Sequence, residues 1–157
     1  MEAQTARKEG MMFMKTNNLI DLDQLSHAEV QELITLAGEI RKNRRGIWTP
    51  ATAKLWRRFF TSPPQGRRCL FRRQLLRLGG KVIGFDNPGN SSVSKGESLK
   101  DTVRIISNYS DLIVMRNPRE GASLAASLYS RVPVINAGDG GHLHPTQTLT
   151  GSCNVIL

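Results

Sequence analysis

The segment from Val132 to Leu149 places three polar side chains directly behind a glycine-rich loop: His144, Thr146 and Gln147. Glycines at positions 138, 140 and 141 let the backbone turn and approach a ligand closely. Pro145 favours the start of a helix, so we expect the first amides of that helix to face the same space. These residue types suit the binding of a carbonyl group and a phosphate. The alternative is a strand-to-helix turn in which His144 only caps the helix.

The same loop also raises the possibility of a metal site. His142 and His144 alternate as a pair of metal ligands would. The loop offers no further good ligand, however, and Cys69 and Cys153 have no metal-binding spacing. We therefore expect no metal and no cofactor. Two isolated cysteines are typical of a reducing compartment, and the cytoplasm is the expected location.

The elements that would position these residues alternate between helix and strand. Ser26 with Glu29, and later Ser98 with Asp101, form capping boxes that precede apolar residues at helical spacing. Strands are predicted at 81–85, 112–115 and 132–136, and a further helix at 120–130. This order predicts an α/β fold with a parallel sheet flanked by helices, in which ligands bind beyond the carboxyl ends of the strands. Arg116 and His144 both follow such ends.

The charge of the chain is unevenly distributed. There are 22 Lys and Arg residues against 13 Asp and Glu, a formal net charge of +9, which would ordinarily indicate a nucleic acid or an anionic membrane as partner. Seven of the basic residues lie between positions 54 and 73, where no acid occurs, and removing them leaves +2. Trp56, Phe59 and Phe60 among these arginines could form a patch for nucleic acid, which is the alternative function. No apolar run approaches the length of a membrane span.

Two further motifs accompany the loop in the same order as in one known family. SSVSKGESLKDT (91–102) and DLIVMRNPREGAS (111–123) precede INAGDGGHLHPTQTL. Together they resemble the catalytic chain of aspartate carbamoyltransferase. The resemblance covers about 15–54 and 75–150, which is the amino-terminal, carbamoyl phosphate-binding half of that family. The related ornithine carbamoyltransferases share the KGES and HP elements, whereas INAGDG followed by HPTQTL is more similar to the aspartate enzyme.

The resemblance implies roles for three residues of the candidate site. Arg116 would contact the oxygens of carbamoyl phosphate, His144 would donate to its carbonyl, and Gln147 would bind the carbamoyl amino group. Such groups suit the chemistry, because a carbonyl under attack by an amine develops oxyanion charge that fixed cations and donors stabilise. Orientation of the two substrates can supply much of the rate, so no covalent nucleophile is needed.

The resemblance also implies an assembly and a set of partners. Lys95 and a serine, Ser91 or Ser92, would lie on a loop that reaches the site of the neighbouring subunit in a homotrimer. The implied substrates are carbamoyl phosphate and L-aspartate, and a regulatory chain is a further possible partner. Neither a membrane nor nucleic acid is the expected partner.

One motif of the family is missing. The family sequence Ser-Thr-Arg-Thr-Arg, which cradles the phosphate, would fall on residues 64–68, where this chain reads Pro-Gln-Gly-Arg-Arg. Arg67 and Arg68 are the phosphate ligands that this alignment retains, but no hydroxyl remains. Pro63 and Pro64 are expected to disfavour the helical start. A reading frame shifted by one base from near Leu55 to near Gln74 would explain the replacement.

The resulting domain prediction has four parts. Residues 1–14 are interpreted as a mobile leader and 15–150 as the carbamoyl phosphate-binding domain, with 55–74 anomalous. Residues 151–157 are interpreted as an aberrant tail in place of a continuing helix, and the aspartate-binding domain as absent. The implied activity is carbamoyl transfer to aspartate in pyrimidine synthesis, and we expect the chain as written to be inactive. The alternative is a non-catalytic protein that binds phosphate-bearing ligands or nucleic acid through residues 54–73.

Overall fold

The computed structural model describes residues 18–42, 55–60, 65–77, 80–85 and 97–156, with side chains for 18–42, 71–77, 80–83 and 97–153. The elements are η1 (Leu22–Gln24), α2 (His27–Lys42), β1 (Leu55–Phe60), α3 (Gln65–Arg77), β2 (Lys81–Phe85), α4 (Leu99–Ser107), β3 (Leu112–Asn117), α5 (Ala122–Tyr129), β4 (Val134–Asp139) and α6 (Pro145–Ile156). This alternation confirms the predicted α/β class. The expected leader at 1–14 lies outside the described residues.

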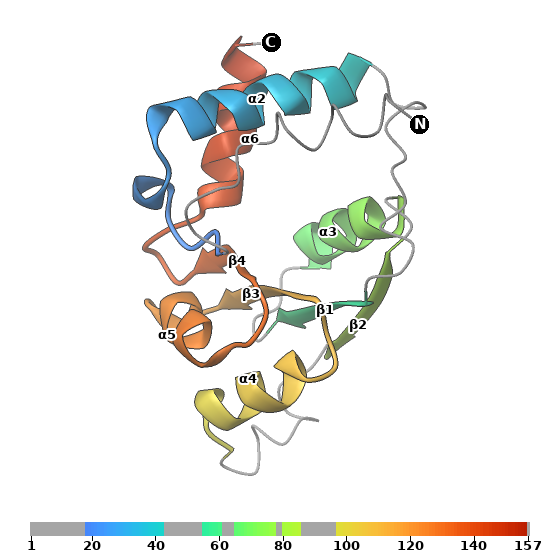
Figure 1. Ribbon diagram of the computed structural model, residues 1–157, viewed down its shortest axis with the longest axis vertical. Coiled ribbons are helices and arrows are strands. Elements are labelled where there is room, and N and C mark those ends of the chain that lie inside the picture. Colours follow the sequence, from blue (N-terminus) through green and yellow to red (C-terminus); the bar gives the residue numbers. More distant parts are fainter. Residues whose placement is uncertain (1–17, 43–54, 61–64, 78–79, 86–96, 157) are drawn as a thin grey trace, which may run out of the picture.

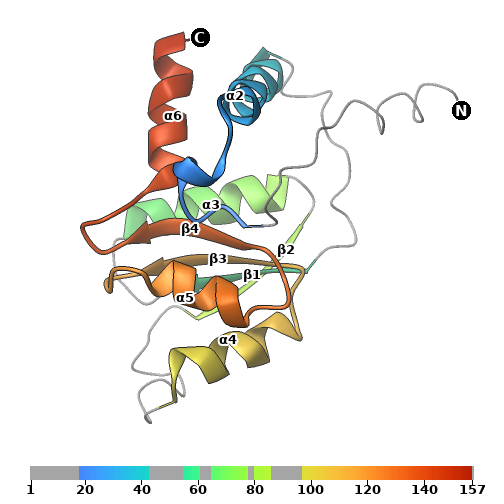
Figure 2. The same ribbon diagram turned by 60° about the vertical axis from the view of Figure 1, so that its left-hand side comes forward.

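The strands form one parallel sheet in the order β2-β1-β3-β4. Helices α4 and α5 lie on one side of the sheet, while α2, α3 and α6 lie on the other (Figure 1, Figure 2). Strand β2 has the predicted bounds. Strand β1 was not predicted, because its residues belong to the segment interpreted as anomalous. It lies between β2 and β3, so residues 55–60 are an integral part of the sheet.

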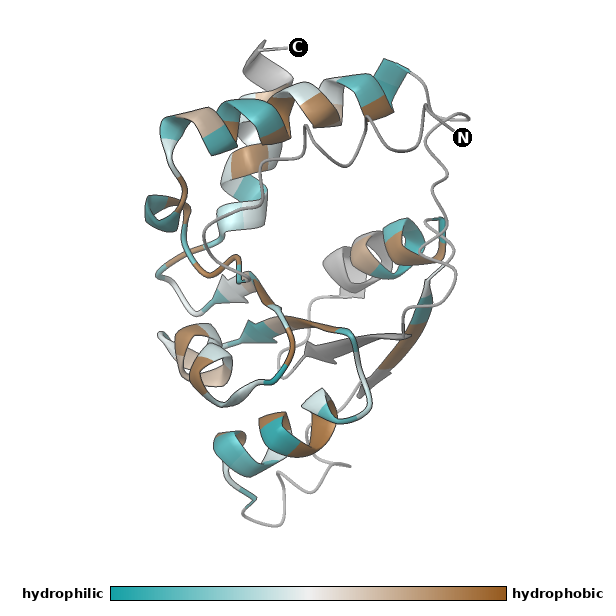
Figure 3. Cartoon of the chain, viewed as in Figure 1, coloured by the Kyte–Doolittle hydropathy of each residue, from teal (hydrophilic) through white to brown (hydrophobic). Residues whose placement is uncertain are grey.

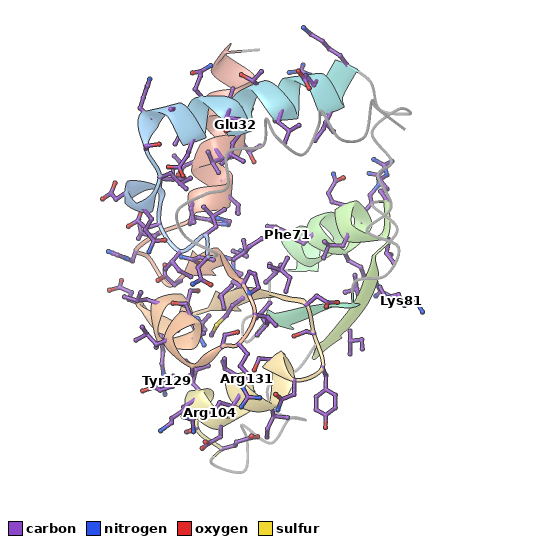
Figure 4. The ribbon with its side chains drawn as sticks, viewed as in Figure 1. Glu32, Phe71, Lys81, Arg104, Tyr129 and Arg131 are labelled. Atoms are coloured by element: carbon purple, nitrogen blue, oxygen red, sulfur yellow. The ribbon has the colours of Figure 1, made fainter. Side chains whose placement is uncertain are left out.

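Strand β3 is buried on both faces, as its unbroken apolar run predicts. Ile113 and Met115 pack into the core on the side of α4 and α5. Leu112 and Val114 pack on the opposite face, against Phe71 of α3. At the surface, the cationic groups of Lys100 and Arg104 in α4 lie 5.3 and 5.7 Å from the ring centre of Tyr129 in α5. Figure 4 labels Arg104 and Tyr129. The burial of β3 on both faces fixes the direction in which this strand carries Arg116.

The predicted capping box is present at the start of α2, whereas at α4 the Ser98 side chain caps the helix and bonds the Asp101 side chain through its hydroxyl. At the start of α2, the Ser26 hydroxyl accepts the Glu29 N–H at 3.3 Å, and the Glu29 carboxylate accepts the Ser26 N–H at 2.7 Å. At the start of α4, the Ser98 hydroxyl accepts the Asp101 N–H at 3.2 Å and donates to its carboxylate at 2.6 Å. The ribbon of α2 carries both hydrophilic and hydrophobic residues, as expected of an amphipathic helix (Figure 3).

Several predicted boundaries are wrong, among them the end of β3, which reaches Asn117 instead of Met115, and the bounds of α5, which spans Ala122–Tyr129 instead of 120–130. Strand β4 runs from Val134 to Asp139 rather than over 132–136, so the first glycine of the loop lies within the strand. Helix α6 continues through Gly151 to Ile156 instead of ending at Thr150, since one glycine costs a helix only about 1 kcal/mol. Helix α3 begins at Gln65, directly after the two prolines, because proline is tolerated ahead of the first turn.

Candidate functional site

Arg116 and His144 are brought to the same edge of the sheet by neighbouring strands. Arg116 is the last residue but one of β3, and His144 lies between β4 and α6. Because β3 and β4 pair in parallel, their carboxyl ends lie side by side. The predicted position after the end of a strand is therefore confirmed for His144, whereas Arg116 lies within its strand instead of following it. We call this region the carboxyl edge.

The carboxyl end of β1 reaches the same level, because Phe60 pairs with Arg116 in the register of the sheet. Helix α3 follows this strand, and Arg67 and Arg68 belong to its first turn. The backbone that carries these two predicted phosphate ligands thus starts at the carboxyl edge. Their side chains lie outside the described residues, as do all atoms of Ser91, Ser92 and Lys95.

The loops that leave β3 and β4 touch through their backbones. The Gly140 N–H donates to the Asn117 carbonyl at 2.8 Å. Gly140 has φ +60°, and a Cβ atom there would lie 2.8 Å from the Pro118 carbonyl oxygen and 3.0 Å from Glu120 Cγ. Only glycine fits both this conformation and this close approach. The contact holds the loop of His144 beside the strand end that carries Arg116.

A β-bulge brings Asp139 into this contact. Met115 pairs with Asn136, whereas Asn117 pairs with Asp139, so β4 contains one residue more than β3 over this stretch. Bulges re-aim side chains and are frequent near functional sites. Asp139 is 2% exposed, and its two carboxylate oxygens accept the N–H groups of Gly121 and Leu143, each at 3.1 Å. Sequence analysis missed Asp139, because one of its partners lies 18 residues away.

Asn136 is a second buried polar residue that sequence analysis missed. Its Oδ1 accepts the Gly138 N–H at 2.8 Å and the Ser123 hydroxyl at 3.2 Å, and its Nδ2 donates to the Ile20 carbonyl at 3.1 Å. These bonds tie β4 to α5 and to the segment before η1. They fix the backbone on which the His144 ring lies.

The His144 imidazole is held on two sides. Its Nδ1 lies 3.2 Å from the Thr146 hydroxyl oxygen, and its ring packs against the backbone of Gly138. When the hydroxyl donates to Nδ1, the ring proton resides on Nε2, which is then a donor. The Nε2 atom and the Nη1 atom of Arg116 are both shielded from solvent. The contacts with Thr146 and Gly138 therefore fix the position of the His144 ring beside the end of β3.

Gln147 lies in the first turn of α6, and its side chain is exposed. The prediction that the first amides of this helix face a ligand is wrong for Gln147. Its N–H donates to the His144 carbonyl at 2.9 Å, because the first turn closes on the residue before Pro145. The side chain of Gln147, rather than its amide, is therefore the group that can reach a ligand.

Metal-ligating residues do not gather in the part of the chain that the structure describes. No group of three or more His, Cys, Asp or Glu residues lies close enough there to hold an ion. His142 is exposed, and its N–H closes a turn onto the Asp139 carbonyl at 3.2 Å. A groove of about 540 Å³ lies elsewhere, where apolar residues of α2 and α6 meet the sheet, and it contains none of the predicted site residues.

Residues 17–155 match the model of the carbamoyl-P binding domain of aspartate/ornithine carbamoyltransferases. The match extends past Thr150, where the resemblance was expected to end. The aspartate carbamoyltransferase catalytic subunit of Clostridium kluyveri is 49% identical over 137 residues, which are 87% of this chain and 45% of that protein. The corresponding subunit of Alkaliphilus metalliredigens is 48% identical over 139 residues. The chain spans about half the length of these relatives.

Solved structures share this fold over most of the chain. Aspartate transcarbamoylase from Trypanosoma cruzi in complex with carbamoyl aspartate and phosphate matches with a TM-score of 0.81 and 31% identity, over 90% of this chain and 47% of that one. The catalytic subunit of M. jannaschii aspartate transcarbamoylase matches with a TM-score of 0.78 and 40% identity, again over 90% of this chain and 47% of the other.

Proposed function

This chain belongs to the aspartate/ornithine carbamoyltransferase family, and from that premise we propose that its carboxyl edge binds carbamoyl phosphate. The observation that carries the proposal is the meeting of the two loops, in which the Gly140 N–H donates to the Asn117 carbonyl at 2.8 Å. This contact holds the Arg116 guanidinium group and the His144 imidazole at the ends of neighbouring strands. A ligand with a phosphate and a carbonyl requires a cation and a donor of this kind.

Each proposed ligand contact uses a different chemical property. The Arg116 guanidinium binds the oxygens of carbamoyl phosphate, because its planar fork matches their geometry. His144 donates from Nε2 to the carbonyl oxygen, with the Thr146 hydroxyl at Nδ1 favouring that tautomer. The side chain of Gln147 binds the carbamoyl amino group from the first turn of α6. Arg67 and Arg68 add positive charge near the phosphate.

The proposed reaction is that of aspartate carbamoyltransferase. The amine nitrogen of L-aspartate bonds to the carbamoyl carbon and loses a proton. The bond between that carbon and the phosphate oxygen breaks, and the electron pair leaves with phosphate. As the amine attacks, the carbonyl oxygen gains negative charge, which the His144 donor and the Arg116 cation stabilise. The product is N-carbamoyl-L-aspartate, an intermediate of de novo pyrimidine biosynthesis.

Aspartate rather than ornithine is the proposed acceptor. The Clostridium kluyveri and Alkaliphilus metalliredigens relatives are both aspartate enzymes, and the INAGDG and HPTQTL motifs favour the same choice. We further propose a cytoplasmic homotrimer, in which Lys95 and Ser91 or Ser92 of one subunit serve the neighbouring site, and to which a regulatory chain can bind. None of the helices that the structure describes combines the length and apolar character needed to cross a membrane.

Calorimetric titration with carbamoyl phosphate tests this proposal. The parent chain should bind the ligand weakly, and Arg116→Ala and His144→Ala should each lower the affinity further. Gly151→Ala is the control, because it changes a helix position with no atom within 4 Å. Equal affinity in the parent and both site variants would contradict the assignment.

Salt-dependent retention on nucleic acid in place of ligand binding would favour the alternative function, for which α3 offers the exposed Arg72 and Arg73.

A further inference from the structure

Asp139 is a buried carboxylate at the point where the two loops of the carboxyl edge meet. It is 2% exposed. One oxygen accepts the N–H of Gly121, the N-cap residue of α5, and the other accepts the N–H of Leu143. We propose that Asp139 is a positioning residue for the carbamoyl phosphate site, an inference that rests on the proposed function. It sets the loop of His144 against the loop that follows Arg116.

The bond to Gly121 anchors Asp139 to the start of α5. Gly121 has φ +73° and no side chain with which to cap α5. The Asp139 carboxylate accepts the N–H of this N-cap residue from the next strand, and its negative charge lies at the positive end of the helix dipole. The carboxylate is therefore fixed by α5, the helix that follows the Arg116 loop.

The bond to Leu143 transmits this anchor to His144, which is the next residue in the chain. The backbone of Asp139 also takes part, because its N–H donates to the Leu143 carbonyl and its carbonyl accepts the His142 N–H, each at 3.2 Å. The backbone and the side chain of Asp139 thus both bond to the loop between β4 and α6. Loss of the carboxylate bond leaves the Leu143 N–H, directly before His144, without this acceptor.

The geometry requires a carboxylate rather than an amide. Two N–H groups approach the side chain, one at each oxygen. Asparagine has nearly the same shape but provides one acceptor, and its NH₂ group would face one of the two donors. Asp139→Asn is therefore a small change in volume that removes one specific bond. A role in filling space alone would be little affected by it.

The test compares Asp139→Asn with Val103→Ala in the full chain. Val103 lies on the buried face of α4 and is 1% exposed, so its truncation lowers stability without altering the loops of the site. Asp139→Asn should weaken carbamoyl phosphate binding about tenfold or more and shift the ¹⁵N resonances of the His144 imidazole. Val103→Ala, measured at the same distance below its melting temperature, should leave the affinity and the His144 resonances unchanged.

Each outcome decides the inference. Asp139→Asn with unchanged His144 resonances and parental affinity would overturn it while leaving the proposed function intact. If the parent does not bind carbamoyl phosphate, the proposed function fails, and the His144 resonances alone decide whether Asp139 positions the imidazole.

If Asp139→Asn does not fold, hydrogen exchange in the parent replaces the variant. Protected amides at Gly121 and Leu143 support the inference, and exchange as fast as at exposed Gly141 overturns it.

Discussion

The imidazole of His144 lies against the backbone of Gly138. A Cβ atom on Gly138 would lie 3.2 Å from the ring Cδ2 and 3.5 Å from Nε2. Gly138 has φ +115°, a conformation that residues with side chains rarely adopt. The backbone of β4 is therefore shaped to receive the ring, and a glycine is required at this position both for its conformation and for the space that it leaves.

Gly138→Ala should destabilise the fold and weaken ligand binding together. The strained backbone should cost about 1–3 kcal/mol of the free energy of unfolding, and the new methyl group would displace the His144 ring. Thermal melting and titration with carbamoyl phosphate measure the two effects. Gly121→Ala reports the cost of strain without a steric clash, since it has φ +73° and no atom within 4 Å of the added Cβ, and it keeps the N–H that Asp139 accepts.

A result in which Gly138→Ala loses stability but keeps the parental affinity would contradict the role of the ring contact. Gly151→Ala completes the comparison, because it is a helical glycine with neither a positive φ nor a neighbour. It should raise the free energy of unfolding by up to about 1 kcal/mol, as alanine is the better helix former.

Ser26→Ala should lower the free energy of unfolding by about 1 kcal/mol without affecting ligand binding. The substitution removes the hydroxyl that accepts the Glu29 N–H, and Glu29 is 3% exposed. Urea denaturation measures the change. Thr35→Ala in the same helix is the matched control, since its exposed hydroxyl only bonds back to the Gln31 carbonyl. A loss as large in Thr35→Ala as in Ser26→Ala would argue against the cap.

The features that were predictable from the sequence are those with local signals. Ser26 and Glu29 are three residues apart, so a capping box is visible in the sequence. The alternation of helix and strand and the positions of Arg116 and His144 at strand ends follow from similar local patterns. Asn136 bonds to Ile20, 116 residues away, and no local pattern indicates that contact. Strand β1 was missed because the departure from the family motif led us to interpret residues 55–74 as anomalous, whereas pairing with β2 and β3 makes residues 55–60 a strand.

Restoring the phosphate motif of the family should strengthen carbamoyl phosphate binding. The variant Pro64→Ser, Gln65→Thr, Gly66→Arg, Arg67→Thr writes that motif over residues 64–68 while Arg68 is kept. The loss of one fixed donor typically costs ~100 to 1,000-fold in rate, so we expect the chain as written to show no turnover in a colorimetric carbamoyl-aspartate assay.

The control for this variant carries alanine at 64, valine at 65 and 67 and arginine at 66, so it keeps similar side-chain shapes but lacks the three hydroxyl groups. Tighter binding in the hydroxyl-bearing variant alone would support the proposed phosphate site. If both variants bind alike, charge rather than hydroxyl contacts sets the affinity. Turnover by the unaltered chain that disappears in His144→Ala would contradict the expected inactivity.

The hypothesis of a shifted reading frame is tested in the coding DNA. Sequencing through the codons for residues 55–74 should find one insertion or deletion near Leu55 and a compensating change near Gln74, relative to genes of the family. A coding sequence that aligns without either change would refute the hypothesis. The basic residues of this segment would then be native features of the chain.

The most direct test of the account compares the affinities of carbamoyl phosphate and inorganic phosphate in the same chain. The two ligands share the phosphate, and only the first has the carbonyl to which His144 is proposed to donate. We predict that the parent prefers carbamoyl phosphate, that His144→Ala binds both ligands with the affinity of phosphate, and that Arg116→Ala weakens both. If His144→Ala kept the preference for carbamoyl phosphate, the central claim that His144 binds the carbonyl would be wrong.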